Sequence, residues 1–254
     1  MKLLFKNHYA EMQKVKVVAL CVVCVLIGFS CKNKNEDKPP LSNEHIYAKV
    51  ENPSNYSNVV EVKLMGFDRN LGKNVDLAHG DWKNGGFAID LPKTLTPDYL
   101  YALINSGGLP TTITGTPSTL NISNKNAKIM NAEFWRVDKD GNMFSHFYPF
   151  KIDKDGNAKS AFYTYVDSDV TISGYIEGVV VIAEFDEDKN ADFLYQWEKT
   201  TTYSIQWKKG WNVWCLSGSL SKTDRQITEQ WTTVPVSELK WYGGDDLWKL
   251  DFYQ

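Results

Sequence analysis

Four cysteines are the residues whose type and spacing first suggest chemistry in this sequence. Cys21 and Cys24 are spaced as Cys-x-x-Cys, Cys31 follows soon after them, and Cys215 stands alone much later. A redox pair needs a polarised environment that lowers the thiol pKa, and a tetrahedral zinc site needs four ligands. Residues 17–29 carry Cys21 and Cys24 but no histidine, acid or base. We therefore expect neither a redox centre nor a metal site there.

The same apolar run predicts an export signal. Lys14 and Lys16 precede it, and its thirteen uncharged residues match the apolar core of a signal peptide. As a helix this run would reach about 20 Å, which is short of the roughly 30 Å of a bilayer's hydrocarbon core. The pattern favours a cleaved signal over residues 1–30 rather than a permanent membrane span.

The end of the run, LIGFSC at residues 26–31, resembles a bacterial lipobox, the signal that places an acylated cysteine at the new N-terminus. The small Ser30 fits this pattern, whereas Gly28 and Phe29 fit only the looser versions found in Bacteroidetes-type lipoproteins. The resemblance implies that the sulfur and the amine of Cys31 carry fatty acids such as palmitate, and two or more acyl chains anchor a protein stably. An ordinary secretory signal with an incidental cysteine is the alternative.

Removal of the signal leaves Cys215 as the only thiol besides the lipidated Cys31. An exported domain of this kind has no intramolecular disulfide and must be stabilised by burial of its core. Residues 31–45 are polar, contain two prolines and lack periodicity, which predicts a flexible tether. The acidic pair Glu36-Asp37 resembles signals that direct such lipoproteins to the cell exterior. We expect a lipid-anchored protein of the outer membrane, within the cell envelope.

The charge of the chain argues against one class of partner. The sequence has 28 basic and 31 acidic side chains, a net charge of −3 at pH 7. Residues 1–30 hold four lysines and one glutamate, so the remainder is more acidic still. Because no basic stripe is present, we expect no nucleic-acid partner. No motif in the sequence requires a cofactor, and none is expected.

Period-two alternation dominates the rest of the chain. In residues 59–64, 87–91 and 203–207 one set of alternate positions is apolar, which predicts half-buried strands. No stretch after the signal shows a helical stripe of more than two turns. The fold class is therefore all-β and mostly antiparallel.

A change of composition suggests two domains. Residues 106–126 are rich in Gly, Pro, Ser, Thr and Asn, and eight of the nine tryptophans follow residue 130. We expect two antiparallel β-sandwich-like domains, an N-terminal one over 46–125 and a Trp-rich one over 127–254. One large β-sandwich or barrel is the alternative, because all-β units can exceed two hundred residues.

One short pattern occurs twice, as VDKDGN at 137–142 and as IDKDGN at 152–157. Its Asp-x-Asp-Gly resembles the start of an EF-hand loop, but glycine comes at the fourth position and the flanks are strand-like. A hairpin turn with Asp at its start and Gly or Asn at positive φ is favoured over calcium. These turns predict strands near 131–137, 143–152, 158–166 and 170–177, with further hairpins at 207–212 and 222–225.

Several short motifs resemble those of a known family. They are GGFAIDLP (85–92), TPDYL (96–100), ISNKNAKIMNAEF (122–134), YTYVDSDVTISG (163–174), KKGWN (208–212) and LKWY (239–242). They are similar to motifs of an uncharacterised family of exported Bacteroidetes-type lipoproteins, over most of residues 45–245. The resemblance implies an exported, lipid-anchored, β-rich protein, and it implies no catalytic residue. Residues 178–198 fall outside the pattern.

Two non-catalytic functions are favoured. The first is a binding module for a glycan or another nutrient, because seven tryptophans lie within 197–248 and aromatic faces offer large contact areas. Alternation places Trp207 and Trp211 in the core, whereas Trp197 is the best candidate for an exposed, ligand-binding ring. The second is a structural or accessory subunit of an outer-membrane complex or of an adhesive surface.

A hydrolase is the least favoured class. His146 alternates with Phe144 and Tyr148, and it is interpreted as a satisfied core histidine. The sequence contains no Gly-x-Ser-x-Gly, no His-Glu-x-x-His and no glycine-rich phosphate loop. We assign no catalytic residue and no metal ligand.

Lipidation of Cys31 can be tested directly. In the native host the intact protein should incorporate labelled palmitate and partition with membranes, whereas Cys31→Ala should stay unlabelled because the acyl-accepting sulfur is lost. The control Cys215→Ala removes the other remaining thiol and should label normally. Equal labelling of the intact protein and of Cys31→Ala would disprove the lipoprotein hypothesis.

Overall fold

The computed structural model describes residues 44–68, 72–104, 119–152, 158–186, 191–221, 223–233 and 239–244. The predicted signal over residues 1–30, Cys31 and most of the tether lie outside the described residues. Lipidation of Cys31 therefore stays a prediction.

Strands form nearly all of the regular structure, so the all-β prediction is confirmed. The helices among the described residues are two short 3-10 turns, η1 (Pro53–Tyr56) and η2 (Pro97–Tyr99). The strands are β1 (His45–Lys49), β2 (Val59–Asp68), β3 (Lys73–Lys83), β4 (Gly86–Asp90), β5 (Tyr101–Ala102), β6 (Asn121–Ile122), β7 (Lys128–Asp138), β8 (Met143–Ile152), β9 (Ala158–Val166), β10 (Val170–Asp186), β11 (Ala191–Trp207), β12 (Gly210–Ser221), β13 (Gln226–Thr232) and β14 (Lys240–Gly243).

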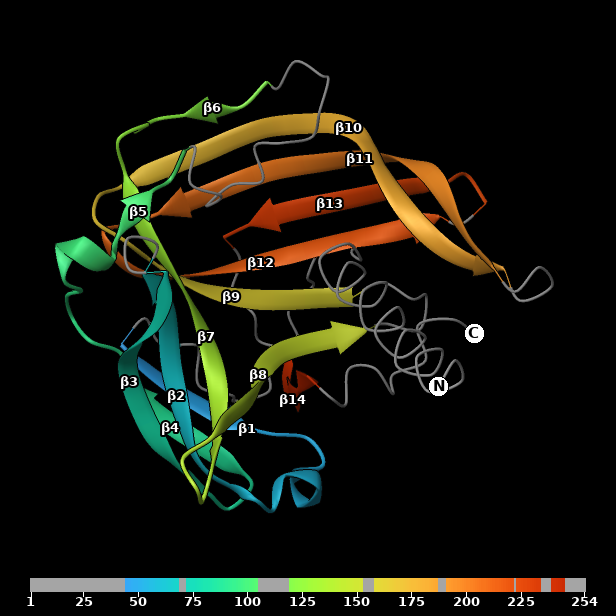
Figure 1. The fold of residues 1–254 in the computed structure, drawn as a ribbon. Coiled ribbons are helices and arrows are strands. Elements are labelled where there is room, and N and C mark those ends of the chain that lie inside the picture. Colours follow the sequence, from blue (N-terminus) through green and yellow to red (C-terminus); the bar gives the residue numbers. More distant parts are fainter. Residues whose placement is uncertain are drawn as a thin grey trace, which may run out of the picture.

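All these strands belong to one open, strongly curved sheet (Figure 1). Its order is β1-β4-β3-β2-β7-β8-β9-β12-β13-β11-β10-β6, with β14 beside β8 and β5 beside β7. Neighbouring strands are antiparallel except for β11 and β13, which are parallel. The arrangement is consistent with a single large sandwich, the alternative expected from the sequence.

Strands β2 and β7 join the two halves of the chain. Val62 pairs with Arg136 and Leu64 with Phe134. This ladder connects residues on both sides of the boundary expected at 106–126. The division into domains 46–125 and 127–254 stays a prediction, but strands from both parts share one sheet.

A first hydrophobic core lies between β1–β4 on one side and β7 and β8 on the other. At its centre the rings of Phe87, Phe134 and Trp241 contact one another, with centroids between 4.9 and 5.8 Å apart. Trp241 reaches this core from the last strand, β14. There Val50 forms a β-bridge with Trp241, and the Glu51 N–H donates to the Trp241 carbonyl over 2.8 Å. The end of the described chain thus packs against its beginning.

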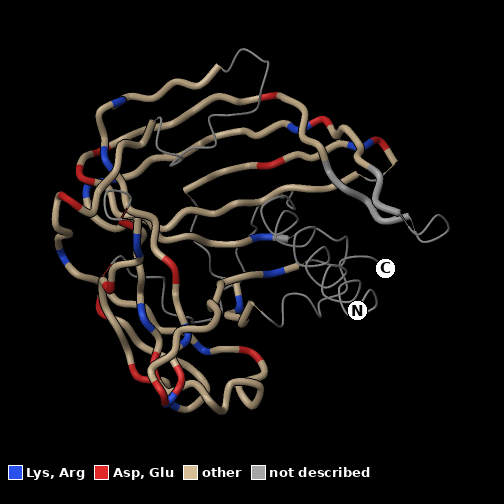
Figure 2. Tube along the Cα trace, in the orientation of Figure 1, with Lys and Arg blue, Asp and Glu red and all other residues tan. Residues whose placement is uncertain are grey.

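A second core lies on the opposite face of the middle strands. In β9, Tyr163 belongs to the first core and Phe162 packs against the second; in β12, Trp211 and Trp214 divide in the same way. Because successive side chains of a strand point to opposite faces, β9 and β12 are covered on both sides. Figure 2 agrees with this for β12, which carries no charged residue.

The hairpin prediction is confirmed for the first DKDGN copy. Asp138 Oδ1 accepts hydrogen bonds from the N–H groups of Asp140 and Asn142, each over 2.9 Å, and Gly141 has a φ of 84°. The Asp138 carboxylate is therefore used by the turn between β7 and β8. The four expected strands correspond to β7–β10, but only β7, β8 and β9 pair with one another, because β10 pairs with β11 and β6. The turn at 222–225 connects the paired strands β12 and β13. The second copy falls mostly outside the described residues.

The expectation of a hairpin at 207–212 is wrong. β11 and β12 follow one another but do not pair, because β13 lies between them. The turn is stabilised by side chains instead. Asn212 Oδ1 accepts from the Lys208 N–H over 2.9 Å, and Asp169 Oδ1 accepts from the Lys209 N–H over 2.8 Å. The KKGWN motif thus specifies a turn between two separated strands.

Gly80 allows β4 to pass close to β3. A Cβ atom added at Gly80 would lie 1.9 Å from the carbonyl oxygen of Ala88. Gly80→Ala should therefore lower the free energy of unfolding by about 1–3 kcal/mol, the usual cost of overpacking, as measured by urea denaturation. In the control, Gly244→Ala, the nearest atom is the movable Ser145 Oγ at 3.2 Å. Equal losses in the two variants would contradict this explanation.

Candidate functional site

Trp197, the ring expected to bind a ligand, is buried. Its exposed fraction is 3%, and it packs against Ile227 with Val180, Tyr195 and Leu220 around the pair. β11 has β10 on one side and β13 on the other, a pairing that alternation along one segment does not reveal. The expectation that Trp197 is exposed is therefore wrong, and we carry its ligand-binding role no further.

Trp214 and Trp231, on two of the central strands, form a stacked row with Phe162 in the second core. Phe162, Trp214 and Trp231 stack across β9, β12 and β13, with 4.6 Å between successive ring centroids. We call the face of the sheet that carries these three rings the inner face. The core positions predicted for Trp207 and Trp211 are confirmed, since their exposed fractions are 2% and 5%.

A buried ion pair lies at one end of the inner face. Lys199 Nζ is 2.6 Å from Glu229 Oε1, and the exposed fractions of the two side chains are 9% and 1%. Thr201 Oγ1 and Trp231 Nε1 donate to Glu229 Oε2 over 3.2 and 3.4 Å. Because the charge and the hydrogen bonds are matched internally, we interpret this pair as part of the packed core.

A second polar group lies at the other end, on β7 and β8. Asn131 Oδ1 accepts a hydrogen bond from Thr164, which neighbours Phe162 on the inner face. Alternation from Asn131 places Glu133 and Trp135 on the same face, and the register of β7 and β8 pairs Trp135 with His146. The inner face therefore carries Glu133, Trp135, His146 and Tyr148, which we call the Glu133 cluster.

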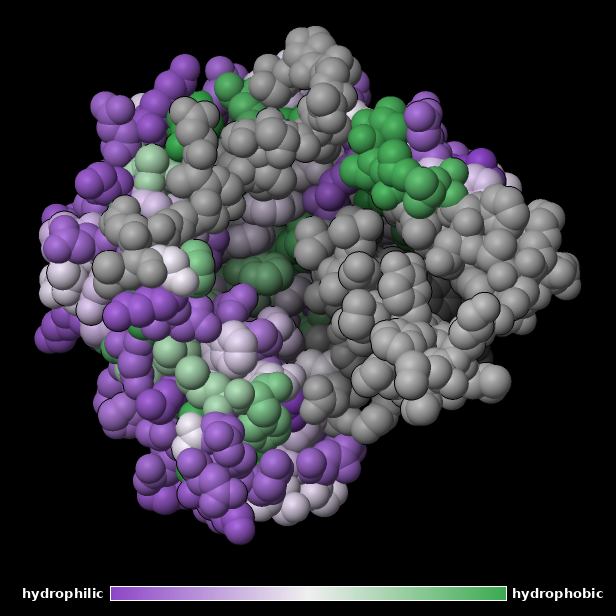
Figure 3. Space-filling view, viewed as in Figure 1, coloured by the Kyte–Doolittle hydropathy of each residue, from purple (hydrophilic) through white to green (hydrophobic). Residues whose placement is uncertain are grey.

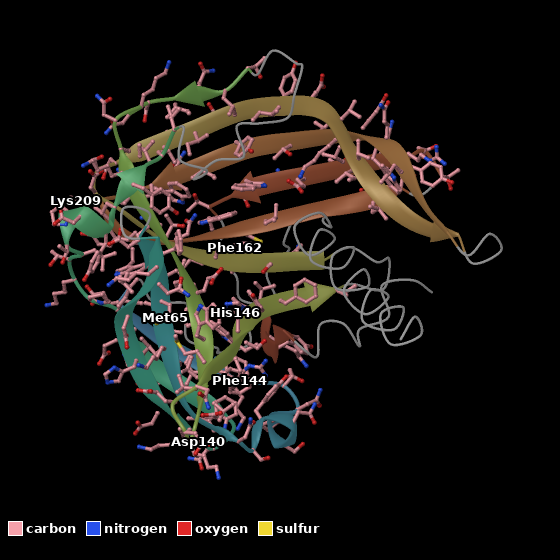
Figure 4. All side chains as sticks on the ribbon, viewed as in Figure 1. Met65, Asp140, Phe144, His146, Phe162 and Lys209 are labelled. Carbon is pink, nitrogen blue, oxygen red and sulfur yellow. The ribbon has the colours of Figure 1, made fainter. Side chains whose placement is uncertain are left out.

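The Glu133 cluster lies where three strands diverge. β7 pairs with β9 as far as Ala132 and with β8 from Phe134 onward. β8 in turn joins β9 only from Phe150. Between these contacts the three strands separate, and Figure 4 shows His146 and Phe162 near this point. The divergence leaves polar side chains on an otherwise covered face partly open to solvent.

Short contacts connect the four side chains of the cluster. The Tyr148 hydroxyl lies 2.7 Å from His146 Nδ1, and His146 Nε2 lies 3.1 Å from Glu133 Oε2. Trp135 Nε1 donates to the same Oε2 over 3.2 Å, and its ring meets His146 edge to face. The exposed fractions are 55% for the Glu133 side chain and 21% for His146. The carboxylate thus faces solvent while the imidazole is mostly covered.

These contacts determine the protonation of the cluster. The contact with His146 lowers the pKa of the Glu133 carboxyl against the opposing effect of burial, and the Trp135 N–H adds to the lowering. Burial raises the pKa of the Tyr148 phenol far above its usual range, and the nearby charge of Glu133 contributes. At neutral pH, therefore, Glu133 is charged and Tyr148 keeps its proton. A carboxylate only accepts hydrogen bonds, and within the cluster the aligned donor to Glu133 Oε2 is Trp135 Nε1, since His146 Nε2 lies close to that oxygen without an aligned hydrogen bond.

This chemistry combines apolar and hydrogen-bonding surface. A half-covered aromatic ring beside a fixed carboxylate suits a ligand with both apolar and hydrogen-bonding surfaces. Glycoside cleavage normally uses two carboxyl groups on either side of the scissile bond. The Glu133 cluster contains one.

The interpretation of His146 as a satisfied core histidine described its burial but not its partners. Its neighbour Tyr148 was recognised from the alternation, whereas Glu133 and Trp135 were not singled out. A signal for them is present in the segment NAEFWRV, where these two residues alternate with the buried Phe134. The predicted hairpin places β8 beside them, but it does not give the register that sets Trp135 opposite His146.

Residues of the family-like motifs contact one another in the fold. Trp211 of KKGWN donates its indole N–H to the carbonyl of Pro92, the last residue of GGFAIDLP, over 2.8 Å. Asp167 of YTYVDSDVTISG accepts from the Lys128 N–H of ISNKNAKIMNAEF over 2.9 Å. These contacts hold turns and strands together, so they specify architecture rather than chemistry.

Comparison of the chain with protein-family models, with curated proteins and with solved structures found no match. Across the described ranges, no helix is long and apolar enough to span a bilayer. In the same residues, no group of three or more His, Cys, Asp or Glu side chains could hold a metal ion. The functional argument therefore depends on the geometry of the inner face.

His146→Ala should raise the pKa of Glu133. An NMR titration of the Glu133 carboxyl carbon should give a midpoint below 4.5, the ordinary value, in the intact protein and a higher one in the variant. Because the folded-state pKa is lowered, the contact stabilises the native state above pH 4.5, and this stabilisation is lost as the pH falls through the lowered pKa. His79→Ala, which removes a histidine of β3, should leave the midpoint unchanged. An unchanged midpoint in His146→Ala would show that the contact does not form.

Proposed function

We propose that this protein is a lipid-anchored cell-envelope protein with a non-catalytic binding role, and that it captures a glycan at the Glu133 cluster. The signal and the lipobox-like LIGFSC support the location. The observation that carries the binding role is the half-exposed carboxylate of Glu133, held by Trp135 and His146 on a partly open face of the sheet.

The cluster is preorganised for binding. Its four side chains contact one another, and they project from two paired strands rather than from loops. Their ordering entropy is therefore lost when the chain folds, not when a ligand binds. A site on rigid strands also keeps its groups at fixed positions, which a weak, solvent-exposed ligand such as a sugar requires.

The shape of the surface supports this role. Figure 3 shows a recess near the centre of the view with apolar side chains at its floor. In Figure 4, His146 and Phe162 are labelled in the same central region. Apolar floors with a few oriented polar groups are the usual composition of small-molecule sites, and the aromatic rings offer flat faces to sugar rings.

An accessory role in an outer-membrane complex or adhesive surface is the second candidate, and one surface favours it. β10 and β11 are 17-residue strands that extend beyond their neighbours as an arm (Figure 1). The arm exposes Val179, Val181 and Leu194, with exposed fractions of 47%, 51% and 73%. Figure 3 shows an apolar patch in this region. Apolar patches of this kind are typical of protein contacts.

A glycan array probed with the mature protein tests the binding proposal. Trp135→Ala should weaken binding to the strongest array ligand about tenfold, which corresponds to about 1.4 kcal/mol, because the stacking ring is lost and the carboxylate loses a hydrogen bond. The matched control is Phe67→Ala, since Phe67 is a 47% exposed ring on β2, outside the cluster. Its binding should be unchanged.

Two outcomes would refute glycan capture. The first is an array without any bound glycan when the protein is folded, as judged by circular dichroism. The second is equal weakening in Trp135→Ala and Phe67→Ala. Co-purification of a stoichiometric protein partner from membranes, lost when Val181 and Leu194 are changed to Ser, would support the accessory role instead.

A further inference from the structure

The side-chain nitrogens of the Glu133 cluster are directed inside it. Trp135 Nε1 donates to Glu133 Oε2 over 3.2 Å, and the Tyr148 hydroxyl shares a hydrogen bond with His146 Nδ1 over 2.7 Å. His146 Nε2 lies 3.1 Å from the same Glu133 oxygen without an aligned hydrogen bond, and it is buried. None of these nitrogens is therefore offered to a ligand.

The Glu133 cluster can still accept hydrogen bonds from a ligand. Within the described residues, no hydrogen bond or ion pair involves Oε1 of Glu133, and this side chain is 55% exposed. The Tyr148 oxygen keeps lone-pair capacity beside its hydrogen bond with His146 Nδ1. A ligand at the cluster therefore meets a full negative charge and two kinds of acceptor oxygen.

Two basic residues near the cluster are directed elsewhere. The charge of Arg136 acts on Tyr148, but its guanidinium lies over the rings of Tyr56 and Phe147 in the first core. The other basic residue lies on β14, the strand beside β8. β14 pairs with β8 so that Tyr242 lies opposite Tyr148, and Lys240 lies opposite Phe150 on the same face. The ammonium of Lys240 is 3.2 Å from Glu51 Oε2 and is thereby neutralised. The nearest basic group on β14 is thus directed to another partner.

We infer that the Glu133 cluster selects ligands that supply hydrogen-bond donors, namely neutral polyols and amino sugars, and that it rejects carboxylated and sulfated sugars. This inference rests on the binding role proposed above and assigns Glu133 as the residue that determines specificity. An anionic sugar would place its charge beside the half-exposed carboxylate of Glu133, and like-charge juxtaposition discriminates strongly against a ligand. A hydroxyl or an ammonium group in the same place gains a charge-assisted hydrogen bond.

The test compares matched sugars at pH 8. The strongest neutral ligand of the array is measured by calorimetry beside the same oligosaccharide with its primary hydroxyls oxidised to carboxylates. The intact protein should bind the oxidised form at least tenfold more weakly. Glu133→Gln keeps the size of the side chain and removes its charge, so the difference should shrink to less than about threefold. Asp81→Asn, an exposed carboxylate on β3, should keep the full difference.

The outcomes separate this inference from the proposal on which it rests. Bound glycans that are mainly uronates, sialylated or sulfated sugars would overturn the selectivity but leave glycan capture standing. Equal affinity of the intact protein for the neutral and oxidised forms would do the same. A difference that persists in Glu133→Gln would remove Glu133 from its assigned role. The lack of any bound glycan would overturn both ideas.

Discussion

Burial of both faces of β9 and β12 is the constraint on which the rest of this structure depends. Tyr163 and Trp211 pack into the first core, while Phe162 and Trp214 pack into the second. A strand covered on both sides needs two covering layers, and one continuous alternating segment cannot provide them. The N-terminal strands form one layer, and residues around β5 and β6, such as Leu103, contribute to the other. The two halves of the chain thus complete one another, and the single thiol among the described residues, Cys215, is buried.

The same burial determines where polar chemistry can occur. Polar atoms on covered faces need partners, and Trp214 Nε1 accordingly donates to Thr164 Oγ1 over 2.8 Å. The hydroxyls of Tyr163 and Tyr203 have no hydrogen-bond partner within the described part of the chain, which costs about 1–3 kcal/mol each. In the centre of the sheet, the free energy gained by burying apolar surface outweighs the cost of these unpartnered hydroxyls. Open polar groups are tolerated only where the strands separate, as at Glu133.

The sequence predicts local features well and pairings poorly, for one physical reason. Alternation shows which side chains share a face, so the strands near 143–152 and 158–166 and the turn begun by Asp138 agree with the structure. Alternation does not show which strand lies alongside. The insertion of β13 between β11 and β12 was therefore missed, and with it the burial of Trp197. The Glu133 cluster was missed for a related reason, because the predicted hairpin places β7 beside β8 but does not give the register, which shifts between Arg136 and Val137.

The contrast between two polar groups on the inner face supports a functional interpretation of one of them. Lys199 and Glu229 are enclosed, and removal of either partner would leave a buried charge, which typically costs 3–5 kcal/mol. The contact between Glu133 and His146 is partly solvated, and pairs of that kind contribute at most about 1 kcal/mol. Folding therefore requires the first pair to be matched and depends little on the second. A group that adds little stability, yet holds a carboxylate at a divergence of strands, fits the binding role proposed above.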